Sequence, residues 1–277
     1  MNAQIAEYAR ECAEKGMRGD YSGCKADFTV DQDYAAYTAE EQGVWQQLAE
    51  RQMVQANRHA HQAYLDGLSA IRIGSRIPDF EEVSHELVKL TGWRIVPVPG
   101  LIPSKPFFEH LAARRFPVTN WLRSADEIDY IVEPDMFHDF FGHVPILSQP
   151  MFADFMQMYG ERALDAIDLG GDEMITRLYW YTAEYGLIRE SGRSLKAFGA
   201  GLMSSGGELP FAMSSDAKTY PMDVETIMRT GYEIDKFQRV YFVMPSFEAL
   251  LKSFESVDVA ELVARYRDDP PLDPASL

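Results

Sequence analysis

The sequence of 277 residues contains no long uninterrupted apolar run, either at its N-terminus or later. A membrane-spanning helix needs about 20 consecutive apolar residues, and a secretory signal needs an apolar core, so we expect neither. Basic residues are also scarce: 26 Lys and Arg stand against 43 Asp and Glu, which gives a formal net charge of -17. Such a surface repels nucleic acid and anionic lipid. We therefore expect no nucleic-acid partner, no membrane partner and a cytoplasmic location.

Cysteine is nearly absent, with only Cys12 and Cys24 in the chain. Two cysteines could form one disulfide, but they make neither a disulfide framework nor a zinc ribbon. Free thiols are the commoner state in a chain with so few cysteines, and we expect them here. Internal repeats, linkers and low-complexity blocks are absent as well. Apolar residues make up 46% of the chain, which is enough to bury a sizeable core.

Helical patterns dominate what is present. Thr38-Ala-Glu-Glu41 matches a capping box, and apolar residues then recur every three to four positions through residues 45–71, which predicts one long amphipathic helix. His59 and His61, two apart on this helix, are expected at the surface. Pro78-Asp79 and Thr91-Gly92 predict the start and the end of a second helix. Further helices are expected over residues 3–15, 151–163 and 172–190.

Strand patterns are few and short. Four prolines within residues 93–108 disfavour a helix there and predict a short edge strand followed by a loop. Residues 116–123 and 239–244 predict two more strands, and the tail, DDPPLDP, is expected to be loose. The expected fold is α+β and predominantly helical, with a small, short-stranded β component. We expect an N-terminal arm over residues 1–30, a single catalytic domain over 31–255 and a C-terminal tail over 256–277.

The densest chemical segment is EPDMFHDFFGHVP, which contains His138 and His143. On a regular helix, positions five apart lie about 140° apart around the axis, so both imidazoles could not reach one metal ion. We therefore predict that the helix ends at Gly142 and that the chain turns His143 back beside His138. The spacing alone is weak evidence, because two histidines five apart also arise by chance.

A third ligand is offered by Glu184 in LYWYTAEYGL. A carboxylate in such an apolar helix is expensive unless it binds a metal ion or pairs with an arginine, and both alternatives stand on these residues alone. Two histidines and one carboxylate form the facial triad of Fe(II) oxygenases, which leaves coordination positions open. A zinc hydrolase accepts the same ligands, but the HExxH signal of zinc proteases is absent.

Three blocks in order, EPDMFHDFFGHVP, LYWYTAEYGL and KAFGAGLMSSGGE, closely resemble the pterin-dependent aromatic amino acid hydroxylases. VPGLIPSKPFF and FQRVYFVMPSF resemble the family as well, so the resemblance covers roughly residues 30–255. It implies a non-haem Fe(II) and a tetrahydropterin as cofactors, with the metal ligands His138, His143 and Glu184. On the pterin side it implies that Phe107 stacks on the pterin ring and that backbone groups of Gly100, Leu101 and Ile102 contact its edge. The side chains of Asp139 and Tyr179 would lie near the pterin. Asp139 is shorter than the glutamate that the family often has.

On the substrate side, the resemblance implies that Arg123 binds the amino acid carboxylate and that Asp135 holds Arg123. Pro134 and Trp180 would pack around the substrate ring with His138, and a hydroxyl of Ser204 or Ser205 would orient a metal-bound histidine. Ile131 departs from the animal enzymes, where we would expect a threonine that contacts the substrate backbone.

The implied reaction is the conversion of L-phenylalanine to L-tyrosine with O2, that is, a phenylalanine 4-monooxygenase. Trp180 matches the phenylalanine and tyrosine branches, and Ile234 stands where the tyrosine branch tends to carry an aspartate. The alternatives are a zinc hydrolase and a non-catalytic amino-acid-binding protein, and the three retained ligands argue against the latter. No heptad tail follows residue 255, so we expect a monomer rather than a tetramer, with a dimer as the alternative.

Overall fold

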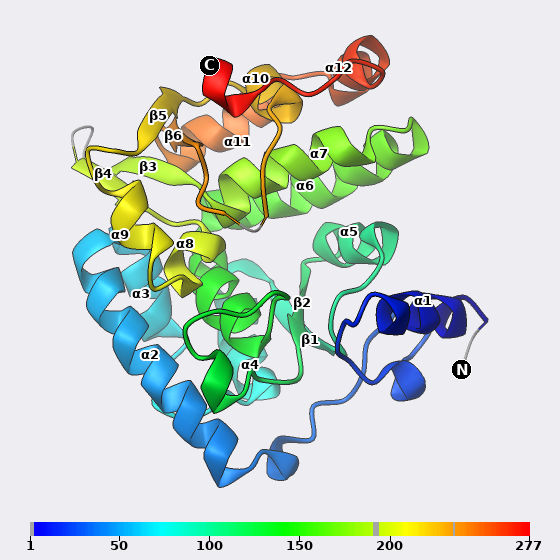
Figure 1. Cartoon of the computed structure of the whole chain (residues 1–277), viewed down its shortest axis with the longest axis vertical. Coiled ribbons are helices and arrows are strands. Elements are labelled where there is room, and N and C mark those ends of the chain that lie inside the picture. The colour runs from blue at the N-terminus through cyan, green and yellow to red at the C-terminus, as the bar shows by residue number, and fades with distance from the viewer. Residues whose placement is uncertain (1–2, 191–193, 235) are drawn as a thin grey trace.

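The computed structural model describes residues 3–190, 194–234 and 236–277, and helices predominate over short strands as predicted (Figure 1). The helices are α1 Ala3–Glu14, α2 Ala39–His59, α3 Gln62–Ala70, α4 Phe80–Thr91, α5 Ser104–Ala112, α6 Pro150–Asp168, α7 Asp172–Tyr179, α8 Ala200–Ser204, α9 Glu208–Ala212, α10 Val224–Arg229, α11 Phe247–Glu255 and α12 Val259–Tyr266. The strands are β1 Arg94–Val98, β2 Arg115–Thr119, β3 Leu187–Glu190, β4 Ser194–Ala197, β5 Lys218–Pro221 and β6 Val240–Met244. None of the helices among these residues is long and apolar enough to cross a membrane.

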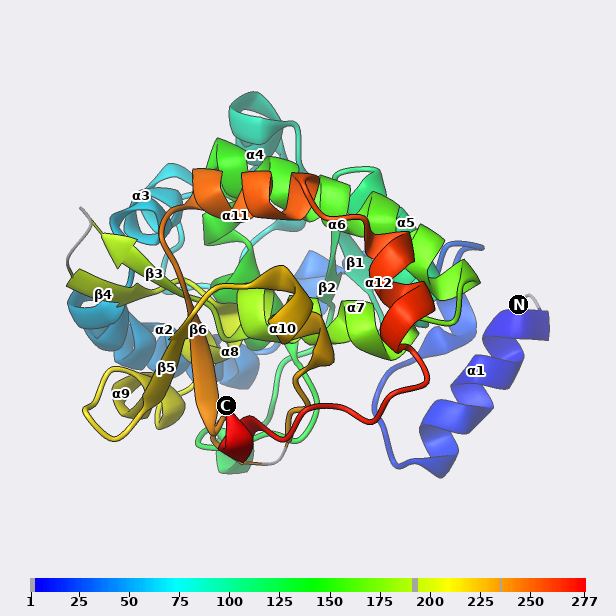
Figure 2. The ribbon, with the colours of Figure 1, turned by 90° about the horizontal axis from the view of Figure 1, so that it is seen from above.

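The strands form two small sheets. β1 and β2 pair in parallel, with Ile95 opposite Phe116. The other sheet has the order β4-β3-β6-β5, in which only the β3–β4 pair is antiparallel. Figure 2 shows this sheet at one end of the molecule and α1 at the other.

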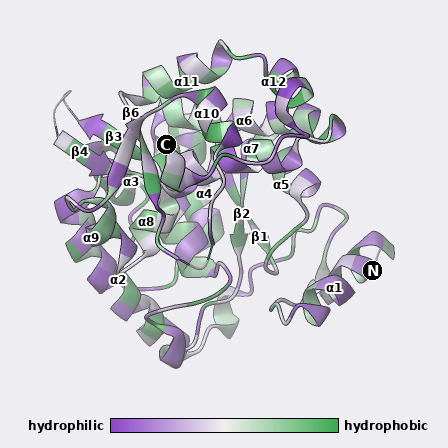
Figure 3. Ribbon diagram, turned by 45° about the horizontal axis from the view of Figure 1, so that its top comes forward, coloured by the Kyte–Doolittle hydropathy of each residue, from purple (hydrophilic) through white to green (hydrophobic). Residues whose placement is uncertain are grey.

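One apolar core joins the elements from α2 to α12. At its centre, the Trp45 ring lies edge-on to Phe137, with the ring centroids 5.4 Å apart, and Phe137 stacks on Phe141 at 4.8 Å. These aromatic contacts fix the segment that carries the two motif histidines. A second, smaller cluster joins α1 to residues 21–28, and in Figure 3 the α1 ribbon carries both hydrophilic and hydrophobic residues.

The single long helix expected over residues 45–71 is wrong, because the chain breaks between α2 and α3. Ala60 is extended, with ψ 151°, and pairs with Ala197, the last residue of β4, while the His61 N–H donates to the Ala197 carbonyl at 2.9 Å. His61 is half-buried and its Nδ1 accepts from the Ala63 N–H, which caps α3. His61 is therefore a capping residue, and the expectation of a surface histidine is wrong.

The caps that are local in sequence are confirmed. Thr38 and Glu41 form the capping box of α2, Asp79 caps α4, and Gly92 ends α4 in the left-handed region with φ 79°. The prolines, however, do not prevent α5. Pro106 is the third residue of this helix, where a backbone N–H has no partner inside the helix anyway.

Three further expectations need correction. The helix expected over residues 172–190 ends before Leu187, where β3 begins, and the strand expected through Arg123 stops at Thr119. The tail is not loose, because the Leu272 N–H donates to the Arg229 carbonyl at 2.7 Å. Cys12 and Cys24 are free thiols, as expected.

Candidate metal centre and adjoining cavity

The two motif histidines lie on one helical segment, Phe137–His143, which is a π-helix rather than an α-helix that ends at Gly142. A π-helix closes i→i+5 hydrogen bonds, so residues five apart lie nearly over one another and both imidazoles can face one point. The ring centroids of His138 and His143 are 5.3 Å apart. Gly142 has another role: a Cβ there would lie 2.8 Å from the Cβ of Ala200, so the glycine allows α8 to approach.

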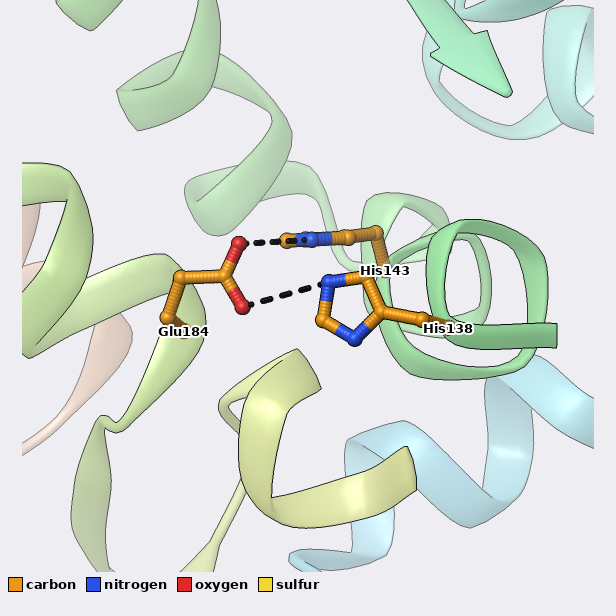
Figure 4. Close-up of side chains that lie close together, drawn as sticks. All are labelled: His138, His143 and Glu184. Carbon is orange, nitrogen blue, oxygen red and sulfur yellow. Dashed lines mark ion pairs between the residues drawn. The ribbon is translucent and has the colours of Figure 1, made fainter. Parts of the chain in front are cut away.

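Glu184 reaches the same point from a second π-helical segment, Trp180–Glu184, which continues α7 (Figure 4). Its Oε1 lies 3.0 Å from Nε2 of His143, and its Oε2 lies 3.5 Å from Nε2 of His138. One ligand atom from each of the three residues lies within 4.8 Å of the others. The ion pairs of Glu184 within the described residues are with these histidines, and so the arginine alternative is wrong.

The electrostatics of the three groups favour a cation between them. Burial works against the charged forms of His138 and Glu184, but the opposite charges prevail: Glu184 raises the pKa of His138 to about 9, and the imidazoles hold the pKa of Glu184 far below its ordinary value. The buried, ionised carboxylate of Glu184 stabilises a positive charge beside it, either a protonated imidazole or a metal ion. The donor set of two imidazoles and one carboxylate suits Fe(II) with open coordination positions.

Neighbouring side chains fix both imidazoles. Nδ1 of His138 lies 2.9 Å from Oγ of Ser204 on α8. The ring of His143 packs on Phe116, with centroids 4.8 Å apart, and its Nε2 lies 3.4 Å from the Tyr179 hydroxyl. Such contacts set ring orientation in metal sites.

A cavity of about 230 Å³ adjoins the three candidate ligands. Every residue predicted for the pterin side lines it, together with Pro134: Gly100, Leu101, Ile102, Phe107, Asp139 and Tyr179. The Phe107 ring is held edge-on by Tyr179 at 5.6 Å. Burial raises the pKa of Asp139, whose Oδ2 accepts from the Thr119 N–H at 2.8 Å. Thr119, which also lines the cavity, carried no signal in the sequence.

Arg123 and Asp135 form a buried, two-pronged ion pair, with Nε to Oδ2 and Nη2 to Oδ1 both 2.8 Å. Burial opposes the charge on Asp135, but Arg123 keeps its pKa below the ordinary value. Oδ1 of Asp135 also accepts from the backbone N–H of His138 at 3.0 Å, which links the pair to the candidate metal centre. Neither residue lines the cavity described above.

Trp180 does not line this cavity either, and its ring is fixed by residues that the sequence did not reveal. It stacks on Tyr232, with centroids 4.2 Å apart, and its Nε1 donates to Oε1 of Gln238 at 2.9 Å. Behind Gln238 is the buried Glu208, which accepts from the Gln238 N–H at 2.7 Å and whose pKa burial raises to about 7. Ile234 is 75% exposed, so its position gives no support to the argument about substrate choice.

Comparisons with known proteins agree with this geometry. A family model described as biopterin-dependent aromatic amino acid hydroxylase matches residues 25–265. The chain is 66% identical to a phenylalanine-4-hydroxylase of Mesorhizobium japonicum over 274 residues, which are 99% of each chain. It is 43% identical over 247 residues to that of Chromobacterium violaceum, covering 88% of this chain and 82% of the relative. A crystal structure of phenylalanine hydroxylase from the latter organism, with iron and phenylalanine bound, is similar with a TM-score of 0.87 at 40% identity, covering 97% of this chain and 96% of that one. The chain belongs to the family of biopterin-dependent aromatic amino acid hydroxylases.

Proposed function

We propose that this hydroxylase converts L-phenylalanine to L-tyrosine, with O2 and a tetrahydropterin as co-substrates and Fe(II) held by His138, His143 and Glu184. The observation that carries the proposal is the convergence of these three ligands at the wall of a cavity that Phe107 also lines. The similar proteins named as phenylalanine hydroxylases support the choice of substrate. When bound, the tetrahydropterin would supply two electrons and Fe(II) would activate O2, so that one oxygen atom enters the aromatic ring and the other is taken by the pterin.

The cavity fits a flat, heteroaromatic cofactor. Phe107 offers an aromatic face for stacking, Tyr179 holds that ring edge-on, and Asp139 offers a carboxyl group to a polar edge. The backbone N–H groups of Leu101 and Ile102 donate no hydrogen bond to any other described residue, so they are free to bind a ligand. Gly100 completes this wall of the pterin site.

On the substrate side, Arg123 binds the carboxylate of the amino acid. Asp135 occupies Nε and Nη2 of Arg123, while Nη1 donates no hydrogen bond to any other described residue. The ion pair thus fixes the guanidinium and leaves one nitrogen for the substrate. Pro134 and Trp180 pack around the substrate ring. Ser204 has an indirect role, because it orients His138.

The direct test is tyrosine formation from phenylalanine by the purified chain supplied with Fe(II), tetrahydrobiopterin and O2. We expect tyrosine to form, phenylalanine to be preferred over tryptophan and tyrosine, and a zinc-loaded sample to be inactive. His143→Ala should retain neither iron nor activity while it stays folded. Faster turnover of tryptophan would contradict the proposed substrate, and stoichiometric iron in His143→Ala would contradict the metal site.

The setting of the enzyme is part of the proposal. We assign it to the cytoplasm, where ferrous iron stays reduced, and the free thiols of Cys12 and Cys24 are consistent with that compartment. The proposed catalytic unit comprises residues 31–255, with 1–30 as an arm and 256–277 as a tail. We propose a monomer, with a dimer as the alternative, and light scattering at micromolar concentration distinguishes these from a tetramer.

A further inference from the structure

The N-terminal arm contacts the loop that forms one wall of the cavity, residues 99–103, called here the cofactor loop. The hydroxyl of Tyr21 donates to the carbonyl of Leu101 at 2.7 Å. Tyr21 is 4% exposed and packs in the small cluster of the arm, where Tyr8 lies edge-on to it at 5.8 Å between centroids. A buried and packed tyrosine has little freedom, so this hydrogen bond fixes the carbonyl of Leu101 in space.

Two glycines let the arm and the cofactor loop come into backbone contact. A Cβ on Gly19 would lie 2.5 Å from the Pro99 carbonyl oxygen, and a Cβ on Gly100 would lie 3.0 Å from the Arg18 carbonyl oxygen. Both glycines have positive φ, 123° and 156°. Residues with side chains would be strained at both positions, so the contact depends on glycine in each segment.

Arg18 attaches the arm to a second segment beside the cavity. Its backbone N–H donates to both carboxylate oxygens of Glu133, at 3.1 and 3.0 Å, and Glu133 precedes the cavity residue Pro134. Its guanidinium donates to Glu127 at 2.9 Å and lies over the Trp121 ring, 5.1 Å from the centroid. Trp121 in turn donates from Nε1 to the Pro99 carbonyl at 2.9 Å. Residues 18–21 thus connect two segments that each contribute to the cavity wall.

The peptide unit between Leu101 and Ile102 links the contact with Tyr21 to the cavity wall. The carbonyl of Leu101 and the N–H of Ile102 belong to the same peptide plane, and the structure holds no cis peptide among the described residues. In a trans peptide these two groups point in opposite directions. Because Tyr21 holds the carbonyl on the side of the arm, the N–H of Ile102 points away from the arm, and Ile102 lines the cavity.

We propose that residues 18–21 act as a strap that holds the cofactor loop in the conformation that binds the pterin, with Tyr21 as a positioning residue. The proposal rests on the proposed role of the cofactor loop in pterin binding. Under this proposal the strap increases the affinity for the pterin, although it precedes residues 25–265, the range that the family model matches.

The test is the Tyr21→Phe variant, which removes one hydroxyl and keeps the ring. Tyr34→Phe is the matched control, because the Tyr34 hydroxyl also donates to a loop carbonyl, that of Ile77, at 3.0 Å, and Tyr34 does not line the pterin cavity. Tetrahydrobiopterin is titrated by calorimetry into each iron-loaded protein without O2. We expect the pterin Kd to rise about fivefold to tenfold in Tyr21→Phe and to stay at the wild-type value in Tyr34→Phe, with equal iron content in all samples.

Hydrogen exchange gives an independent readout on the free protein. The amide of Phe107, which donates to the carbonyl of Pro103 in the cofactor loop at 3.1 Å, should exchange faster in Tyr21→Phe than in the wild type and remain unchanged in Tyr34→Phe. A wild-type pterin Kd in Tyr21→Phe would overturn the strap. Phe107→Leu separates the two proposals: it should weaken pterin binding whether or not the arm matters, and an unchanged Kd there would contradict the pterin site itself.

Discussion

The hydroxyl of Ser204 lies 2.9 Å from Nδ1 of His138 and 2.8 Å from the carbonyl oxygen of Ala200. A carbonyl accepts only, so the single hydroxyl proton goes to Ala200, and Ser204 must accept the Nδ1 proton of His138. For the neutral imidazole that binds a metal ion, this arrangement selects the tautomer of His138 whose Nε2 is free. One short helix, α8, therefore sets both the orientation and the protonation of a candidate metal ligand.

The first prediction is that Ser204→Ala weakens iron binding without removing it. Loss of the hydroxyl lets the His138 ring rotate and adopt either tautomer, and such a loss typically costs about 10- to 100-fold in metal affinity. Iron retention against a chelator series measures it. Ser205→Ala is the control, because that hydroxyl accepts from the Glu208 N–H and is not bonded to His138. Equal retention in both variants would remove Ser204 from the metal centre.

Features that depend on neighbours in sequence were predictable. Thr38, Asp79 and Gly92 begin or end their helices as expected, because a cap is made by residues within one turn. The family and the reaction were predictable as well, since three motifs in a fixed order carry the candidate ligands and the comparisons confirm the family. What could not be predicted depends on partners distant in the chain. The break at Ala60 follows from pairing with Ala197, which no local pattern encodes.

In the candidate site, too, features set by sequence neighbours were predictable, and those set by distant residues were not. The motif marked His138 and His143 as candidate ligands, and the structure brings them together, but the turn at Gly142 was wrong. A π-helix differs from an α-helix by one residue per hydrogen-bonded ring and has no sequence signal of its own. Gln238 lies within a recognised motif, yet its bond to Trp180 joins residues 58 positions apart. Tyr21 lies 80 positions from Leu101, so the arm looked independent of the cofactor loop.

The second prediction concerns the Arg123–Asp135 pair. Arg123→Ala leaves the fully buried Asp135 without its cation, and breaking a buried pair from one side typically lowers the free energy of unfolding by about 3–5 kcal/mol. Phenylalanine affinity should fall as well, by roughly 30-fold or more. Urea unfolding and steady-state kinetics measure the two effects. Arg123→Lys should recover only part of each, because an ammonium lacks the planar fork.

A double variant separates the stability effect from the binding effect. Arg123→Met with Asp135→Leu replaces both charges by apolar groups, so much of the lost stability should return while phenylalanine binding stays weak. If phenylalanine affinity returned together with stability, Arg123 would have no direct role in binding the substrate carboxylate.

The third prediction is a pH dependence that originates in Glu208. Burial raises the pKa of this carboxyl from 4.5 to about 7, so between these values the folded state binds more protons than the unfolded state. Stability from this group is then present below pH 4.5 and is lost as the pH rises to 7, by an amount on the order of 3 kcal/mol. Glu208→Gln keeps the acceptor for Gln238 and Tyr241 but does not titrate.

The measurement is urea unfolding of the wild type and Glu208→Gln at pH 5 and pH 7.5. The variant should gain stability relative to the wild type as the pH rises, whereas Glu14→Gln, at an exposed position, should show no such trend. A constant difference between Glu208→Gln and the wild type at both pH values would show that Glu208 does not titrate in this window.

The fourth prediction concerns the bond between Gln238 and Trp180. Gln238→Leu leaves the Nε1–H of Trp180 without its acceptor, and a donor left unpaired in this way costs about 1–3 kcal/mol. The indole is then free to leave its stack on Tyr232, so kcat/KM for phenylalanine should fall by about tenfold while the pterin KM stays near the wild-type value. Steady-state kinetics with each substrate varied in turn measures this split.

A double-mutant cycle tests whether Gln238 acts through Trp180. Trp180→Phe keeps an aromatic ring but removes the N–H, so adding Gln238→Leu to it should change kcat/KM for phenylalanine by less than about twofold. A full tenfold loss in that background would mean that Gln238 acts by another route, such as its bonds to the carbonyls of Glu233 and Lys236. A loss that appears only when Trp180 is present identifies Gln238 as the residue that holds the indole against the substrate ring.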